Sequence, residues 1–259
     1  PKISVGATEN VIMAASLANG RTRILNAAKE PEIIDLANCL IKMGASIKGA
    51  GNSEIIIDGV KELKGCNYRV IPDRIEAGSF AIAAAITKSS LELYNCEPKH
   101  LESLSKKLIN AGVNWESNKD IIKITSDGIL KPVNVQTAEY PDFPTDLQAQ
   151  FMTLMTVANG NSEIIENIFE NRFMHVPELL RMGANISVNG GVAKVSGVQN
   201  LKGAQIMATD LRASISLIIA ALRAEGESYI SRIYHLDRGY ERIEQKFQDC
   251  GANIERITN

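Results

Sequence analysis

The chain has 259 residues, of which 45% are hydrophobic and 22% are charged, and its formal net charge is −2 at pH 7. This composition is typical of a soluble globular protein, and it lacks the basic surplus that nucleic-acid binders carry. No apolar run reaches the eighteen or so residues of a membrane span, and the N-terminus does not resemble a signal peptide. We therefore expect a cytoplasmic protein without nucleic-acid or membrane partners.

Cysteine usage supports the same interpretation. The four cysteines are isolated from one another and from histidines at metal-ligand spacing, so we expect reduced, mostly structural thiols and no metal site. Cys250 stands just before a glycine at a helix end and is expected in the core.

Four amphipathic segments follow one another along the chain and end in similar turns. Each turn contains a glycine where a helix C-cap needs a left-handed residue. These glycines are Gly44, Gly112, Gly183 and Gly251, at intervals of 68, 71 and 68 residues. Alternating, strand-like sequence follows the first three. The spacing predicts a unit repeated about every seventy residues.

A second kind of helix precedes each amphipathic segment. Its surface is apolar almost all round, which is typical of a buried helix. In chain order these helices are expected at residues 9–18, 75–86, 147–158 and 211–224. Hairpins are expected to turn at 49–52 and 189–191, and related phrases follow them at 59–65 and 197–203. The predicted unit is strand, buried helix, strand, amphipathic helix and hairpin, which gives an α/β fold with a boundary near residue 70.

Three of the buried helices open with related phrases at residues 72–77, 144–149 and 209–213. Composition favours capping, because Asp and Thr at these positions satisfy free backbone N–H groups. The repeat adds a functional hypothesis, because equivalent helix starts would face one side and attract an anion. An aspartate held there could accept a proton from a hydroxyl group.

Three arginines are candidates for holding such an anion. Arg212 lies one turn inside its helix, Arg238 follows an Asp, and Arg172 stands between two aromatic residues. A surface arginine beside a carboxylate is usually a solvated ion pair. Convergent arginines would instead suit a doubly anionic substrate, because the guanidinium fork matches carboxylates and phosphates.

Four runs identify a family. They are residues 140–150 (YPDFPTDLQAQ), 169–181 (FENRFMHVPELLR), 207–213 (MATDLRA) and 233–244 (IYHLDRGYERIE). They resemble signatures of the UDP-N-acetylglucosamine enolpyruvyl transferases, and the resemblance extends over essentially the whole chain. It implies two domains, each an inside-out α/β barrel of three βαβαββ repeats. Residues 1–70 would be the last repeat of the first domain, and residues 71–259 would be the three repeats of the second.

The resemblance also implies a reaction. Such enzymes transfer the enolpyruvyl group of phosphoenolpyruvate to the sugar 3-hydroxyl and release phosphate, without metal or cofactor, in the first committed step of peptidoglycan synthesis. Asp146 matches the proposed acid/base. Thr145, Ile168 and Arg172 match sugar-nucleotide positions, and Arg212 and Arg238, with Asp210 beside them, match the phosphoenolpyruvate site. Lys2, Ser4, Val5 and Gly6 match contacts to the uridine diphosphate.

The chain departs from the family pattern over a large region, because most of one domain, with its arginines and histidine, has no counterpart here. The family's early Lys-Asn pair and its mobile loop with a reactive Cys, or Asp in some members, have no counterpart here. We therefore expect a truncated form that is inactive alone and needs the missing N-terminal part of the enzyme.

Two other functions stay open from the sequence. A non-catalytic sugar-nucleotide-binding or scaffold module would bind UDP-N-acetylglucosamine without turnover. An RNA 3′-terminal phosphate cyclase would have similar topology, but the acidic balance and the absence of its catalytic motif disfavour it.

Overall fold

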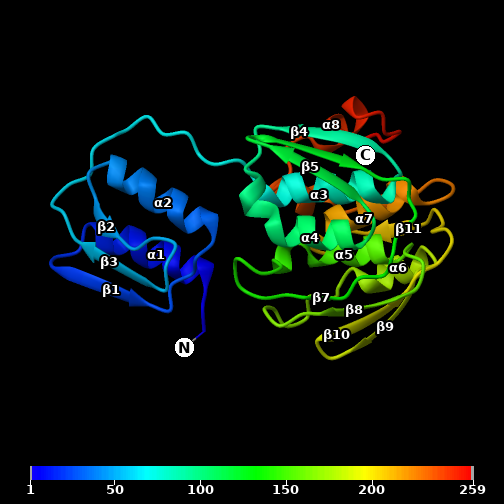
Figure 1. The fold of residues 1–259 in the computed structure, drawn as a ribbon, viewed down its shortest axis with the longest axis horizontal. Helices are drawn as coiled ribbons and strands as arrows, with labels where there is room; N and C mark the ends of the chain where they lie inside the picture. Colours follow the sequence, from blue (N-terminus) through cyan, green and yellow to red (C-terminus); the bar gives the residue numbers. More distant parts are fainter. Residues whose placement is uncertain (1, 258–259) are drawn as a thin grey trace. The chain divides into compact units, whose positions relative to one another are not determined.

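The computed structural model describes residues 2–257, which divide into two compact units. The first unit contains the residues up to Pro72 and also Glu139–Asp142, and the second contains Asp73–Ala138 and the residues from Phe143 onward. The elements of the first unit are α1 (Val5–Ser16), β1 (Arg21–Leu25), α2 (Pro31–Lys42), β2 (Ser46–Lys48) and β3 (Glu54–Asp58), as labelled in Figure 1.

The second unit contains the remaining elements. Its helices are α3 (Arg74–Ile86), α4 (Glu102–Asn110), α5 (Gln148–Met155), α6 (Val176–Arg181), α7 (Leu211–Arg223) and α8 (Ile243–Asp249). Its strands are β4 (Ser90–Tyr94), β5 (Asn114–Asn118), β6 (Ile121–Thr125), β7 (Val135–Gln136), β8 (Asn161–Ile165), β9 (Asn185–Asn189), β10 (Val192–Ser196), β11 (Gln205–Met207) and β12 (Tyr229–Ser231). Short 3₁₀ helices cover Pro98–Leu101, Thr145–Leu147 and Ile233–Arg238.

The sheets reproduce the predicted repeat. In three of them, the strand after the predicted buried helix pairs antiparallel with the second strand of the following hairpin, giving the orders β1-β3-β2, β4-β6-β5 and β7-β8-β10-β9. The fourth sheet has only β11 and β12, paired in parallel. Among the described residues, no strand follows α8.

The glycines that end the amphipathic helices have the predicted conformation. The φ angles of Gly44, Gly112, Gly183 and Gly251 are +108°, +97°, +86° and +92°. A side chain is disfavoured in this left-handed region, so glycine ends each helix at low cost. The prediction of four equivalent helix ends is confirmed.

A second pair of glycines explains the repeated phrases after two hairpins. A Cβ atom on Gly59 would lie 1.6 Å from the carbonyl oxygen of Ala18, and one on Gly197 would lie 1.6 Å from that of Ala158. In both units the glycine N–H also donates to an equivalent carbonyl, that of Gly20 or Gly160. The phrases therefore recur because each repeat brings the chain back against the end of its buried helix.

The second unit has helices inside and sheets outside. The helix α5 packs against both α3 and α7. Figure 1 shows these three helices between the sheet of β4 and β5 and the sheet of β8–β10. Their inward side chains, such as Ile82, Phe151 and Leu217, are fully buried. The apolar character of these helices is thus explained by burial on several sides.

Some sequence-based expectations were wrong. The helix α1 begins at Val5 rather than Glu9. It exposes Val11 and Met13, because α2 and one sheet are what covers it among the described residues of the first unit. Among the described residues, no strand lies before α1 or between β3 and α3. Cys250 is exposed rather than in the core. It lies at the end of α8, where no described strand follows to cover it.

Candidate active site

Two of the three related helix starts are capped by aspartate. Asp210 Oδ1 accepts from the backbone N–H groups of Arg212 and Ala213, at 2.8 and 3.0 Å. Asp73 does the same at the start of α3, with N–O distances of 2.7 and 3.0 Å. Capping is therefore the structural role of these two carboxylates.

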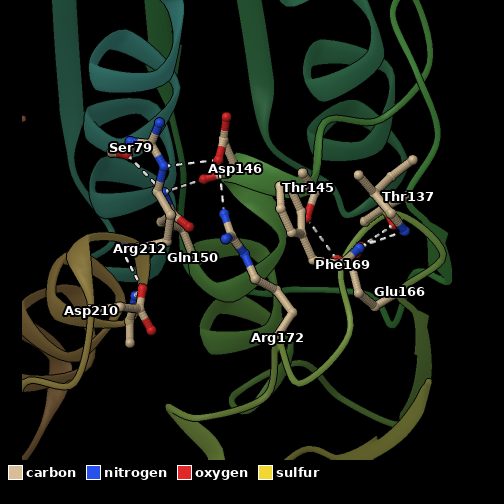
Figure 2. Close-up of polar contacts among 12 residues, drawn as sticks. Ser79, Thr137, Thr145, Asp146, Gln150, Glu166, Phe169, Arg172, Asp210 and Arg212 are labelled. Atoms are coloured by element: carbon tan, nitrogen blue, oxygen red, sulfur yellow. Dashed lines mark hydrogen bonds and ion pairs between the residues drawn. The ribbon is translucent and has the colours of Figure 1, made fainter. Parts of the chain in front are cut away.

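Asp146 has different partners, although its phrase is related. It lies in the 3₁₀ helix before α5 and makes no side-chain cap. Its Oδ1 accepts from Arg172 Nη2 at 2.8 Å and from Arg212 Nε at 3.0 Å, as Figure 2 shows. Its Oδ2 makes no hydrogen bond to any described residue. Asp146 is therefore held by two cations and keeps one oxygen free.

The three charged side chains are partly buried. The exposed fractions are 36% for Asp146, 21% for Arg172 and 20% for Arg212. Burial alone would lower the pKa of Arg212, but the neighbouring Asp146 carboxylate offsets this effect and the pKa is raised. Two guanidinium groups thus meet at one oxygen of Asp146, near the start of α7. Guanidinium groups that are partly buried suit an anionic ligand.

A buried carboxylate lies beside this cluster. Glu166, at the end of β8, is 6% exposed and accepts from four donors. Its Oε2 accepts from the hydroxyl of Thr145 at 2.9 Å. Its Oε1 accepts from the hydroxyl of Thr137 at 2.9 Å and from the N–H groups of Ile168 and Phe169 at 2.8 and 3.0 Å. Glu166 thus fixes the turn in which Ile168 lies. Figure 2 shows Glu166 with Thr137, Thr145 and Phe169 around it.

A chain of buried hydrogen bonds supports the other side of Asp146. Gln150 Nε2 donates to the backbone carbonyl of Asp146 at 2.9 Å and to Ser79 Oγ at 3.1 Å. Ser79 Oγ lies 2.9 Å from the hydroxyl of Tyr240, which follows the segment that ends in Arg238. Because these groups are buried, the network ties α3, the start of α5 and the segment of Tyr240 together beside Asp146.

Arg172 is held by its own loop. Its guanidinium lies 4.8 Å from the ring centroid of Phe169, within the range of a cation–π contact. His175, three residues later, is 1% exposed, and burial lowers its pKa to about 4. A hydrogen bond to the backbone of Arg172 acts in the opposite direction on this pKa. His175 is therefore a neutral imidazole that anchors the loop.

This histidine predicts a pH dependence of stability. Its pKa is lower in the folded protein than the 6.5 of a free side chain. Below pH 6.5 this histidine becomes protonated in the unfolded chain, whereas in the folded protein it stays neutral until the pH approaches 4. The free energy of unfolding should therefore fall between about pH 6.5 and pH 4. The loss should approach about 3 kcal/mol. Urea unfolding of the parent and of His175→Gln at several pH values measures it, and identical pH slopes would contradict this role.

The remaining sequence candidates belong to other segments of the chain. Lys2 precedes α1 in the first unit, while Val5 and Gly6 form its first turn. Ser4 caps this helix, with its Oγ 3.3 Å from the N–H of Ala7. Arg238 ends the last 3₁₀ helix of the second unit, is exposed, and has no ion-pair partner between residues 2 and 257.

Sequence reasoning missed Glu166 and Gln150. For Glu166 there was a signal: Ser162 and Ile164 are buried in β8, and the two-residue period places Glu166 on the same face. A carboxylate on a core face needs partners, so it could have been singled out. Gln150 gave no comparable signal, because its partners come from distant parts of the chain.

Comparison with known proteins places this chain in a family. The family model of EPSP synthase (3-phosphoshikimate 1-carboxyvinyltransferase) matches residues 1–247. The chain belongs to the EPSP synthase family.

Curated relatives are closer in sequence. A protein from Shewanella sp. (strain ANA-3), named UDP-N-acetylglucosamine 1-carboxyvinyltransferase, is 57% identical over 98% of this chain. A protein of the same name from Shewanella sediminis (strain HAW-EB3) is also 57% identical over 98% of the chain. These matches confirm the sequence resemblance to UDP-N-acetylglucosamine enolpyruvyl transferases. The chain spans 61% of the length of each relative.

Solved structures agree on the fold. The enolpyruvyl transferase NikO from Streptomyces tendae matches 97% of this chain, and 60% of its own, with a TM-score of 0.88 and 26% identity. EPSP synthase from Acinetobacter baumannii matches the whole chain, and 62% of its own, with a TM-score of 0.73 and 20% identity, which supports the fold alone. The predicted α/β fold of enolpyruvyl transferases is confirmed. No helix in the described part of the chain is long and apolar enough to cross a membrane.

Proposed function

We propose that the chain is part of an enzyme that transfers the enolpyruvyl group of phosphoenolpyruvate to the 3-hydroxyl of UDP-N-acetylglucosamine and releases phosphate. The name of the 57% identical relatives supports this substrate pair. The observation that carries the proposal is the Asp146 carboxylate, which is fixed by Arg172 and Arg212 through one oxygen while the other oxygen is free.

This geometry suits a general base. A carboxylate can take the proton of an attacking hydroxyl only if an oxygen lone pair is accessible. Oδ2 of Asp146 meets this condition, because both arginines contact Oδ1 and the side chain is 36% exposed. We infer that the sugar hydroxyl transfers its proton to Asp146 Oδ2 as its oxygen bonds to C2 of phosphoenolpyruvate.

The reaction balances in two steps. In the addition, the C2–O bond forms and C3 of the former double bond takes up a proton, giving a tetrahedral ketal. In the elimination, the bond from C2 to the phosphate oxygen breaks, C3 loses a proton and the double bond returns. Arg212 and Arg238 would hold the phosphate and carboxylate, because charge-assisted contacts to guanidinium groups suit both anions.

Thr145, Ile168 and Arg172 would contact the sugar nucleotide, and Lys2, Ser4, Val5 and Gly6 would contact the uridine diphosphate, as the family resemblance implies. Asp210 would keep Arg212 in place by capping α7. We propose that residues 1–70 are the last repeat of one domain and residues 71–259 are the three repeats of the other.

The setting of the reaction follows from its product. An enolpyruvyl sugar nucleotide would enter peptidoglycan synthesis in the cytoplasm, and so support cell-wall biogenesis, cell shape and division. The remaining N-terminal part of the enzyme would be the main partner, because the chain spans 61% of its relatives.

Phosphate release tests the function. In a chimera, the chain replaces the segment that it matches in the Shewanella sp. (strain ANA-3) relative. We expect the chimera to release phosphate from phosphoenolpyruvate only when UDP-N-acetylglucosamine is present, whereas the chain alone should show no turnover. If the chimera folds and binds the sugar nucleotide without turnover, the chain is instead a non-catalytic binding module.

Arg238→Ala should separate the two substrates. Arg238 is exposed and its guanidinium is not engaged by other described residues, so it is available to an anion. In the chimera, its loss should weaken phosphoenolpyruvate binding about ten- to a hundredfold, the effect of one charge-assisted contact, with little change for the sugar nucleotide. Isothermal titration measures both affinities. Arg181→Ala, on the exposed face of α6, is the matched control, and equal weakening of both substrates by Arg238→Ala would make Arg238 structural.

A further inference from the structure

We propose that Glu166 is a positioning residue that holds the Thr145 hydroxyl as a hydrogen-bond acceptor for the substrate. The identity of that substrate, UDP-N-acetylglucosamine, rests on the proposed function. Glu166 itself is 6% exposed, so it acts through the groups that it orders rather than by touching the ligand.

The direction of the hydrogen bond decides what Thr145 can recognise. An ionised carboxylate only accepts, so the single hydroxyl hydrogen of Thr145 is directed to Glu166 Oε2, at an O–O distance of 2.9 Å. The lone pairs of the hydroxyl are then left for other partners. The Thr145 side chain is half-buried, so a ligand can reach it. The ligand group that meets Thr145 must therefore be a donor, an N–H or an O–H.

The same carboxylate also sets the distance between two parts of the site. Its Oε1 accepts from the N–H groups of Ile168 and Phe169, which closes the turn that leads to Arg172. Its Oε2 holds Thr145, the neighbour of Asp146. Glu166 thus binds the chain segments that carry both partners of the 2.8 Å ion pair between Arg172 and Asp146.

A purely structural role makes a different prediction, and the chain offers a matched control. Thr137 donates to the same carboxylate at 2.9 Å, but it is completely buried and cannot meet a ligand. Thr137→Val removes one hydrogen bond from Glu166 as Thr145→Val does. Only Thr145→Val should change the affinity for UDP-N-acetylglucosamine.

Glu166→Gln reverses the polarity without changing the size of the side chain. The amide oxygen can still accept from the turn, while the amide NH₂ faces Thr145 and donates to it. The hydroxyl hydrogen then points toward the ligand donor. In the chimera, we expect the Kd for UDP-N-acetylglucosamine to rise roughly tenfold, the effect of one lost hydrogen bond, and Thr145→Val to act similarly. Thr145→Ser, which keeps the hydroxyl, should stay within about twofold of the parent.

A double-mutant cycle distinguishes positioning from structure. Because Glu166 acts through Thr145, the double variant Glu166→Gln/Thr145→Val should bind no more weakly than the weaker single variant. Additive losses, or a Glu166→Gln protein that melts at a lower temperature but binds with parental affinity, would overturn the inference. If Glu166→Gln does not fold, the comparison of Thr145→Val with Thr145→Ser tests the inference. Equal affinities of these two variants for UDP-N-acetylglucosamine would overturn it.

The same cycle measured by urea unfolding needs no ligand. It should show coupling between Glu166 and Thr145, because Glu166→Gln reverses the hydrogen bond that Thr145→Val removes. A parent chimera that does not bind UDP-N-acetylglucosamine would overturn the proposed function. In that event the unfolding cycle still tests the contact between Glu166 and Thr145. Additive changes in the free energy of unfolding would by themselves overturn the inference.

Discussion

Replacing Asp146 with asparagine in the chimera is expected to lower kcat by about 10²–10⁴-fold, the usual loss when a general base is removed. Asparagine keeps the shape and one carbonyl oxygen for Arg172 and Arg212, but it cannot accept the proton of the sugar hydroxyl. Sugar-nucleotide affinity should change much less than kcat. Steady-state phosphate release and isothermal titration measure the two effects.

The control for Asp146→Asn is a helix-start aspartate of similar sequence. Asp73 caps α3 through two backbone N–H groups, and asparagine is an equally good cap. Asp73→Asn should therefore leave turnover within a few-fold of the parent. An Asp146→Asn chimera with turnover as high as that of Asp73→Asn would end the assignment of Asp146 as base.

Arg212→Met should have the second large effect. Arg212 is 20% exposed, and its Nε contacts Asp146 Oδ1 at 3.0 Å. Removing it takes one cation from the anion site and leaves Asp146 with Arg172 alone. Loss of a charge-assisted contact in a partly desolvated site should weaken phosphoenolpyruvate binding about ten- to a hundredfold, and misplacement of Asp146 should lower kcat as well.

Arg223 provides the matched control on the same helix. It ends α7, away from Asp146, and its guanidinium donates to Asn200 at 3.2 Å. Arg223→Met should reduce stability slightly and leave the KM for phosphoenolpyruvate unchanged. Equal kinetic effects of Arg212→Met and Arg223→Met would show that α7 stability, rather than a substrate contact, determines activity.

The repeat could be predicted from the sequence because it rests on local chemistry. A glycine such as Gly112 ends its helix through its own backbone conformation, and the apolar residues of α3 and α7 show burial without knowledge of their partners. The exposed face of α1 was not predictable in this way. Its sequence is that of a buried helix, but what covers a helix is set by neighbours and not by the helix itself.

The partners of Asp146 illustrate the limit for the site. The phrases around Asp73, Asp146 and Asp210 look alike, and local rules predict a cap for each. Two are caps, whereas Asp146 is bound by Arg172 and Arg212, which lie 26 and 66 residues away in the sequence. Such long-range pairing depends on how the repeats pack. The family resemblance supplied the candidate site residues that local chemistry could not.

The chemical identity of the product tests the proposed function most directly. The chimera is incubated with phosphoenolpyruvate and UDP-N-acetylglucosamine, and the sugar nucleotide is then analysed by mass spectrometry and NMR. Transfer predicts a sugar nucleotide that carries the enolpyruvyl group as an ether at the 3-hydroxyl, formed in equal amount to the released phosphate and largely lost in Asp146→Asn. Phosphate release with an unmodified sugar nucleotide and free pyruvate would contradict it, because the protein would then hydrolyse phosphoenolpyruvate rather than transfer its enolpyruvyl group.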